Sequence, residues 1–273
     1  MTATDWPRPL VSPDWLQANL GTVGLVIIDA TIFPVSLRQG GRGWISAEHD
    51  YRTRGHLPGA VYGDQTEDFI DLTSNQDLAQ PTAEQFARAA GRLGIDRKSR
   101  VVIYDAARGQ WAARLWWLFR LFGHDDVGVL DGGFSNWVGE KRPIITGQVT
   151  RPVRVYEVSE RPAWRAQRSE LETPTIVKVV PRADDAAGDD SIGRAQEQVP
   201  DSSVFFDLAA TLDPVTKKLR PQDVVRQQAE ATLAGHRGRI VGASPSGISA
   251  ARILLLLDSL GYADLGLLQL NRQ

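Results

Sequence analysis

The chain of 273 residues contains no cysteine. This absence excludes disulfides, thiolate metal ligands and thiol nucleophiles together, and it leaves the redox compartment undetermined. An excess of either charge is also lacking, because 31 basic and 33 acidic residues give a net charge of −2. We therefore expect no nucleic-acid partner and no membrane-surface partner.

Long hydrophobic runs are missing as well. Apolar runs such as Ile253–Leu257 are far too short to cross a bilayer. The opening residues MTATDWPRPL lack a basic start followed by an apolar stretch, so they do not resemble a signal peptide. A cytoplasmic location is the default expectation.

Histidine is scarce, with four residues in the chain. No histidine stands at ligand spacing from the acidic pairs, so we expect no metal and no cofactor. Those pairs are typical of solvated turns; they are Asp125-Asp126, Asp184-Asp185 and Asp189-Asp190.

The most informative stretch is Arg239–Tyr262. A β-branched run leads into a loop rich in Gly, Ser and Pro, and a long apolar helical pattern follows from Ile248 to Leu257. A loop at the N-terminus of a helix presents unpaired N–H groups and the positive end of the helix dipole. This pattern therefore favours an anion in the loop.

The same design occurs in the first half of the chain, at Val101–His124. When Ala113-Arg114 is aligned with Ala251-Arg252, the same spacing matches Gly123 to Gly261, His124 to Tyr262 and Leu130 to Leu268. Upstream, Pro81 and Pro221 each open a helical pattern at nearly that spacing. Chance similarity would not keep this order, so we infer a duplication and two domains.

The remaining elements follow from periodicity and capping signals. Leu10–Leu20 predicts a helix capped by Ser12, and the apolar run Leu25–Asp29 predicts a buried parallel strand. Residues 38–56 are polar and Gly-rich, which favours a surface loop. The aromatic stripe of the helix after Val101–Asp105 is typical of core and interface packing; it comprises Trp111, Trp116, Trp117, Phe119 and Phe122.

Several of these motifs together resemble the rhodanese family, and more closely its tandem thiosulfate/3-mercaptopyruvate sulfurtransferases. They are LPGAV, PTAEQF, VVIYDAARGQWAARLWWLFRLFGHDDVGVLDGGFSNW and SPSGISAARILLLLDSLGY. The resemblance is close over residues 10–145 and thinner over 175–268. It implies an α/β fold of two tandem rhodanese-like domains, each a parallel sheet with helices on both faces. The domains would span residues 1–145 and 175–273, with a linker over 146–174.

The resemblance also assigns roles to the two loops. The N-terminal copy is non-catalytic in this family and often carries Asp at the nucleophile position, which matches Asp105 in a loop with Arg108 and Gly109. The C-terminal copy normally carries a Cys that holds a sulfane sulfur as a persulfide, and its loop pattern lays that Cys on Ser244. The implied anion-binding loop comprises Ser244, Pro245, Ser246, Gly247, Ile248 and Ser249. Arg182 and Arg194 are the candidates for holding a substrate carboxylate.

Serine at this position has a chemical consequence. A thiol can ionise at a helix N-terminus, whereas a serine hydroxyl does not ionise near neutral pH and forms no stable bond to a sulfane sulfur. Pro245 also removes one backbone donor from the loop. We therefore expect a catalytically impaired rhodanese-like protein that binds a small oxyanion or an unspecified protein partner. The alternative is a sulfurtransferase with residual or altered activity, with another protein supplying the thiol.

Other catalytic chemistries have weaker support in the sequence. GASPSG misses the GxSxG nucleophile elbow, because Ser246 stands two residues after Ser244, and His236 should lie at the far end of the preceding strand. A hydrolase using Ser244 or Ser246 therefore remains the third hypothesis. Arg114 and Arg252 stand at the same place in each repeat, where each either ties loop carbonyls or contacts an anion.

Overall fold

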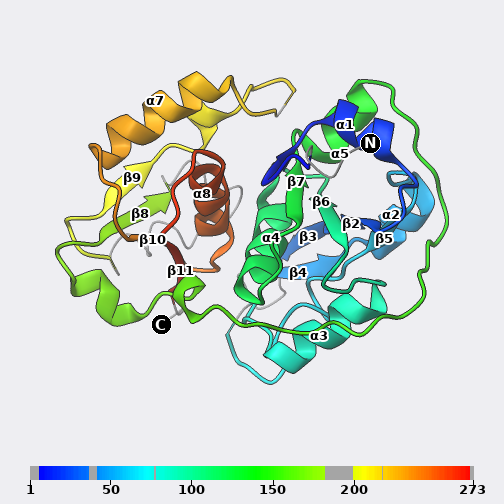
Figure 1. The fold of residues 1–273 in the computed structure, drawn as a ribbon, viewed down its shortest axis with the longest axis horizontal. Helices are drawn as coiled ribbons and strands as arrows, with labels where there is room; N and C mark the ends of the chain where they lie inside the picture. Colours follow the sequence, from blue (N-terminus) through cyan, green and yellow to red (C-terminus); the bar gives the residue numbers. More distant parts are fainter. Residues whose placement is uncertain (1–5, 37–41, 77, 182–198, 217, 271–273) are drawn as a thin grey trace. The chain divides into compact units, whose positions relative to one another are not determined.

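The computed structural model describes residues 6–36, 42–76, 78–181, 199–216 and 218–270. The chain divides into two compact units, unit 1 over Met1–Glu160 and unit 2 over Arg161–Gln273 (Figure 1). The division falls inside the range 146–174 that the sequence assigned to a linker. Both units are α/β folds, in which helices flank a parallel sheet.

Unit 1 contains a five-stranded parallel sheet in the order β1-β7-β6-β2-β5. Its strands are continuous buried apolar runs, as expected for a sheet covered on both faces. The predicted strand at Leu25–Asp29 is confirmed as β2 and lies between β6 and β5, with Leu25 beside Arg100 and Asp29 beside Tyr104. The strands are β1 (Leu10–Val11), β2 (Leu25–Asp29), β5 (Ala60–Tyr62), β6 (Arg100–Tyr104) and β7 (Val127–Leu130).

Helices cover both faces of this sheet. Right-handed crossovers place α3 and α4 on one face and α1, α2 and α5 on the other (Figure 1). The predicted N-cap is confirmed, because Ser12 Oγ accepts the N–H of Trp15 at 3.2 Å. The helices are α1 (Pro13–Asn19), α2 (Glu48–Arg54), α3 (Ala83–Arg92), α4 (Gln110–Leu121) and α5 (Gly133–Gly139).

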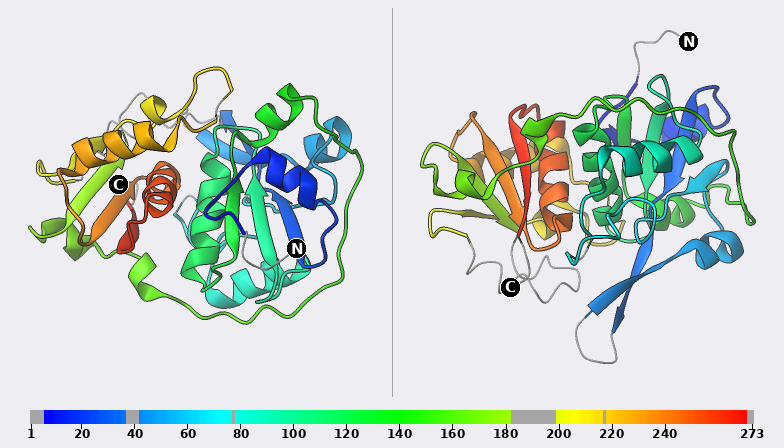
Figure 2. Two further views of the ribbon diagram at one scale, coloured as in Figure 1. Left: turned by 45° about the horizontal axis from the view of Figure 1, so that its top comes forward. Right: turned by 90° about the horizontal axis from the view of Figure 1, so that it is seen from below.

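The prediction of a surface loop over residues 38–56 was wrong for the part that the structure describes. Ile32–Ser36 (β3) and Arg42–Ser46 (β4) pair antiparallel, and α2 follows directly. Figure 2 shows the two strands as a long blue ribbon extending from unit 1. The polar character of this stretch reflects exposure of a two-stranded ribbon, in which alternate side chains meet solvent.

The aromatic stripe of α4 is core, as the sequence predicted. All five side chains are buried. Phe119 packs edge-to-face on Phe86 of α3, with ring centroids 5.0 Å apart, and Phe122 stacks on Phe86 at 4.5 Å. These contacts pack the C-terminal end of α4 against α3.

The segment after α5 runs along unit 1 as an extended strap, residues 147–160. Its backbone bonds to unit 1 at several points: the Gly147 N–H donates to Arg52 O at 2.8 Å, and the Arg154 N–H donates to Gly91 O at 3.0 Å. Tyr156 is buried against Phe86. The strap is therefore an integral part of unit 1.

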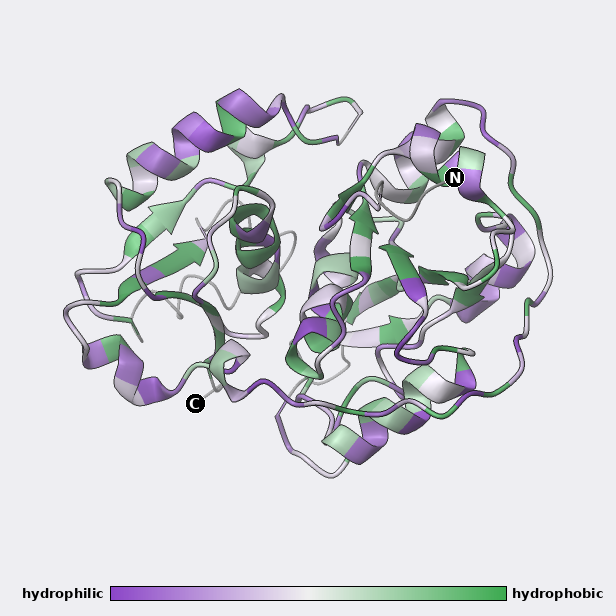
Figure 3. Cartoon of the chain, in the orientation of Figure 1, coloured by the Kyte–Doolittle hydropathy of each residue, from purple (hydrophilic) through white to green (hydrophobic). Residues whose placement is uncertain are grey.

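Unit 2 contains a four-stranded parallel sheet in the order β11-β10-β8-β9. Figure 3 shows α8 mostly hydrophobic and α7 mostly hydrophilic on its outer side, which matches their burial. The elements are β8 (Val177–Pro181), β9 (Val204–Phe206), α7 (Gln222–Leu233), β10 (Ile240–Ser244), α8 (Ile248–Ser259) and β11 (Leu265–Gln269), with 3₁₀ turns at Pro162–Trp164, Arg168–Glu172 and Ala209–Thr211.

The two sheets share one topology. In strand order, β11-β10-β8-β9 of unit 2 corresponds to β7-β6-β2-β5 of unit 1. Even the edge strand β1 has a short counterpart, because Arg165 forms a parallel bridge to Leu267 where Leu10 pairs with Val129. This correspondence agrees with the internal repeat inferred from the sequence.

Candidate functional site

The candidate site lies where β10 ends and α8 begins. Ile240 and Val241 are fully buried and β-branched, which suits a central parallel strand. The chain reverses through Pro245 and Ser246, and Gly247 adopts the left-handed conformation (φ 74°) as the N-cap of α8. A side chain at Gly247 would be strained there, so this glycine is what allows so short a turn.

Ser244 is the last residue of β10, and its side chain points to the N-terminus of α8. Its Oγ accepts the N–H of Ala250 at 3.3 Å. Its backbone carbonyl accepts from Gly247 at 3.3 Å and from Leu270 at 3.0 Å. The predicted nucleophile position thus stands against the first turn of the helix.

Two further backbone donors of the loop remain. The N–H groups of Ile248 and Ser249, in the first turn of α8, have no acceptor among the residues that the structure describes. First-turn amides have no partner within their own helix and carry the positive end of its dipole. Ser244 is 1% exposed and Ser246 7%. The loop is therefore buried, and the Ile248 and Ser249 N–H groups are donors of the kind that bind a small oxyanion.

The corresponding loop of unit 1 carries its own anion. The Asp105 carboxylate accepts four backbone N–H groups, which belong to Ala107 (2.9 Å), Gly109 (3.0 Å), Trp111 (2.8 Å) and Ala112 (2.9 Å). Burial raises the pKa of Asp105, and the four donors oppose that rise. The side chain of Asp105 fills the place that an external anion would take.

The other first-loop residues have clear places. Gly109 is the left-handed N-cap of α4 (φ 78°), the counterpart of Gly247. Arg108 is exposed. Thr31, which the sequence did not single out, supports the loop, because its hydroxyl accepts the N–H of Ala106 at 3.0 Å and donates to Asp29 at 2.5 Å.

Arg114 ties loop carbonyls. Its guanidinium donates to Phe69 O, to Leu78 O at 2.9 Å and to Gln65 Oε1 at 3.0 Å. Of the two roles considered for this position, the structural one holds in unit 1. Arg252 is buried at the corresponding place of unit 2.

The two substrate-binding candidates, Arg182 and Arg194, lie outside the described residues. Their role remains a prediction.

No histidine of unit 2 stands near Ser244. His236 is the single histidine of Arg161–Gln273. Its Nε2 contacts Arg239 O at 3.1 Å, at the amino end of β10, whereas Ser244 ends that strand. A five-residue strand spans roughly 16 Å, so within unit 2 His236 is out of reach as a base for Ser244.

Across the described ranges, no group of three or more His, Asp or Glu side chains is placed to hold a metal ion. No helix of the described part is both long enough and apolar enough to cross a membrane.

Comparison with known proteins identifies the fold family. The model of the rhodanese-like domain matches residues 12–140. The thiosulfate sulfurtransferase of Cricetulus griseus is 38% identical over 151 residues, which cover 53% of this chain and 48% of that protein. The human 3-mercaptopyruvate sulfurtransferase is 40% identical over 147 residues, which cover 52% and 47%. Residues 12–140 of the chain form a rhodanese-like domain.

The sequence matches span about half the length of these relatives. The rhodanese fold extends over both units: the crystal structure of SseA from Escherichia coli, a 3-mercaptopyruvate sulfotransferase, superimposes with a TM-score of 0.81 at 23% identity and covers 99% of this chain and 100% of that one. Tum1 from Saccharomyces cerevisiae gives a TM-score of 0.73 at 20% identity, with 94% and 91% covered. At these identities the likeness concerns the fold alone.

Proposed function

We propose that this rhodanese-family protein does not carry out persulfide-based sulfur transfer and that its second loop binds a small oxyanion. The observation that carries the proposal is Ser244. It ends β10 against the first turn of α8. The family pattern lays the catalytic Cys on this position, and the chain contains no cysteine at any position.

The chemistry explains why oxygen does not replace sulfur here. In sulfur transfer, a thiolate attacks the outer sulfur of thiosulfate, an S–S bond forms and sulfite leaves. A helix N-terminus lowers a thiol's pKa enough to populate the thiolate. The Ser244 hydroxyl stays protonated without a neighbouring base, and His236, the one histidine of unit 2, stands at the other end of β10.

Oxyanion binding rests on the remaining donors. The Ile248 and Ser249 amides have no acceptor among the described residues, and Ser244 Oγ takes only the Ala250 N–H. Because the loop is buried, the guest must be small and must replace its hydration with these amides. Sulfate, sulfite and thiosulfate have that size and charge.

The test is cyanide-dependent formation of thiocyanate from thiosulfate or 3-mercaptopyruvate. We expect wild-type protein and Ser244→Ala to give the same background rate. Ser244→Cys should give turnover above both, at a low rate because Pro245 offers no N–H to the transferred group.

The matched control is Ser259→Cys, which places a thiol at the last residue of the same helix, where the dipole disfavours a thiolate. It should remain at background. Turnover by the wild type above Ser244→Ala would overturn the proposal and support the alternative of residual sulfurtransferase activity.

A further inference from the structure

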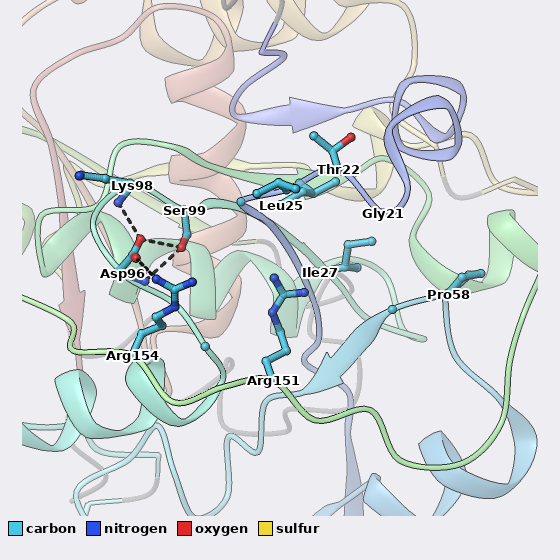
Figure 4. Close-up of a pocket in the computed structure, with 14 residues that line it drawn as sticks. Gly21, Thr22, Leu25, Ile27, Pro58, Asp96, Lys98, Ser99, Arg151 and Arg154 are labelled. Carbon is cyan, nitrogen blue, oxygen red and sulfur yellow. Dashed lines mark hydrogen bonds and ion pairs between the residues drawn. The ribbon is translucent and has the colours of Figure 1, made fainter.

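Unit 1 contains a cavity of about 460 Å³ at the edge of its sheet opposite to the Asp105 loop. The cavity lies where β2 begins and just before β5 and β6 begin, whereas Asp105 follows the carboxyl end of β6. Its volume is within the range of small-molecule sites. The lining residues that matter here are Thr22, Leu25, Ile27, Pro58, Lys98 and Arg151 (Figure 4).

Arg151 is the central cation of this cavity. Figure 4 shows its side chain between the Asp96–Arg154 pair on one side and Ile27 and Pro58 on the other. It is half-buried, and no carboxylate pairs with it in the described part of the chain. Partial burial and the neighbouring Arg154 lower the pKa of Arg151, the response of a guanidinium without a counter-ion.

The one carboxylate in the cavity wall is already engaged. Asp96 accepts from the Lys98 N–H at 3.0 Å, from Ser99 Oγ at 3.0 Å and from Arg154 at 3.4 Å. Its charge is therefore shared with Arg154. The Lys98 side chain is exposed and lies on the far side of the Asp96–Arg154 pair, away from Arg151 (Figure 4). The cavity has more positive than negative charge.

The opposite wall is apolar. Leu25 and Ile27 of β2 and the ring of Pro58 face the cavity, and the Thr22 side chain lies at its edge (Figure 4). A ligand that satisfies both walls has an anionic group at one end and an apolar body at the other. Arginine suits carboxylate and phosphate groups, because its planar fork donates two parallel hydrogen bonds.

The backbone fixes Arg151 in this position. The strap passes close to the end of α3, where Gly94 (φ 75°) has no side chain, and a Cβ built there would lie 2.7 Å from Arg151 Cβ. Three residues further, the Arg154 N–H donates to Gly91 O at 3.0 Å. Because the backbone holds Arg151 in place beside an apolar wall, this guanidinium is preorganised to bind a ligand.

We propose that this cavity binds a small organic anion, whose phosphate or carboxylate group is held by Arg151 and whose apolar body lies against Leu25 and Ile27. The site is separate from the Ser244 loop, so it stands whether or not sulfur transfer is absent.

Binding to the full chain is tested by calorimetric titration with phenyl phosphate, benzoate, inorganic phosphate and benzyl alcohol. At least one of the two aromatic anions should bind, which identifies the anionic group, and it should bind more tightly than inorganic phosphate and benzyl alcohol. Arg151→Gln should weaken this binding at least about tenfold, the effect of losing a charged hydrogen-bond donor. Lys98→Gln should change it little, because that side chain is exposed and points away from Arg151.

The control is Arg54→Gln, which makes the same charge change on exposed α2 and should leave binding unchanged. Amide chemical shifts of wild-type protein locate the ligand without any variant, and we expect them to move at Thr22, Gly59 and Arg154. Three results would overturn the proposal: no anion binds, Arg151→Gln binds as well as Arg54→Gln, or benzyl alcohol binds as tightly as the anions.

Discussion

The loop after β6 and the loop after β10 stand at the same place in two sheets of the same topology, but they meet the N-terminus of the following helix differently. In unit 1, the Asp105 carboxylate accepts four backbone N–H groups. In unit 2, Ser244 Oγ accepts one, from Ala250. Ala112 and Ala250 are counterparts in the repeat, so one helix position donates to a carboxylate in one copy and to a hydroxyl in the other.

This difference shows how a duplicated loop acquires separate uses. A carboxylate built into the chain neutralises the helix terminus and closes the loop to external anions. A hydroxyl leaves part of the terminus available but supplies no nucleophile of its own. We therefore propose that the first loop is a structural element and that the second keeps the donors of an anion site without its reactive atom.

The largest effect should come from making the first loop resemble the second. Asp105→Ser leaves several buried N–H groups without an acceptor, and we expect a loss of roughly 3–5 kcal/mol in the free energy of unfolding of unit 1. Urea unfolding followed by tryptophan fluorescence measures it, because seven of the eight tryptophans are in unit 1.

Asp71→Ser is the control for that substitution. Asp71 accepts hydrogen bonds in a turn at the surface, from the N–H and hydroxyl of Thr73. An effect of Asp105→Ser no larger than that of Asp71→Ser would mean that the four hydrogen bonds contribute little to stability.

A second contrast concerns pH. His124 follows α4 and is buried, with its Nε2 2.9 Å from Ser99 O, while its counterpart Tyr262 follows α8 and accepts from Arg237. Burial lowers the pKa of His124. The unfolded chain takes up this proton more readily than the folded one, so stability of unit 1 should fall as pH drops below about 6.5.

The slope from this histidine is at most about 1.4 kcal/mol per pH unit. His124→Gln keeps a donor for Ser99 O and should remove that part of the slope, measured by urea unfolding at pH 7 and pH 5.5. The matched variant His49→Gln changes a histidine whose side chain is exposed and should leave the slope unchanged. Identical slopes in wild type and His124→Gln would show that another group causes the acid sensitivity.

The smallest effect on stability should come from substitution of Ser244. Ser244→Ala removes one hydrogen bond of 3.3 Å, and we expect a loss of about 1 kcal/mol in the stability of unit 2. Hydrogen exchange at the Ala250 N–H reports it locally. A loss as large as that of Asp105→Ser would mean that the second loop is held as firmly as the first, which would contradict the comparison.

Much of this organisation could be predicted from the sequence, because it depends on local signals. Apolar runs such as Leu25–Asp29 mark buried strands, Ser12 and Pro81 mark helix starts, and the spacing between the repeats predicted sheets of one topology. The end-of-strand position of Ser244 followed from the same signals, as did the separation of His236 from it.

What the sequence did not predict depends on contacts between distant residues. The hairpin of β3 and β4 was missed because its polar residues resemble a loop until the two strands pair. The support that Thr31 gives to the Asp105 loop arises only when β2 and β6 lie side by side. Arg151 was likewise hidden, since nothing local indicates that the strap passes the start of β2.

The most direct test of the central claim is the intact mass of the protein after incubation with thiosulfate and removal of excess reagent. The account predicts an unchanged mass for the wild type and for Ser259→Cys, and a gain of one sulfur atom for Ser244→Cys, where a thiolate would stand at the N-terminus of α8. A sulfur atom retained by the wild type, or a Ser244→Cys protein that retains none, would contradict it.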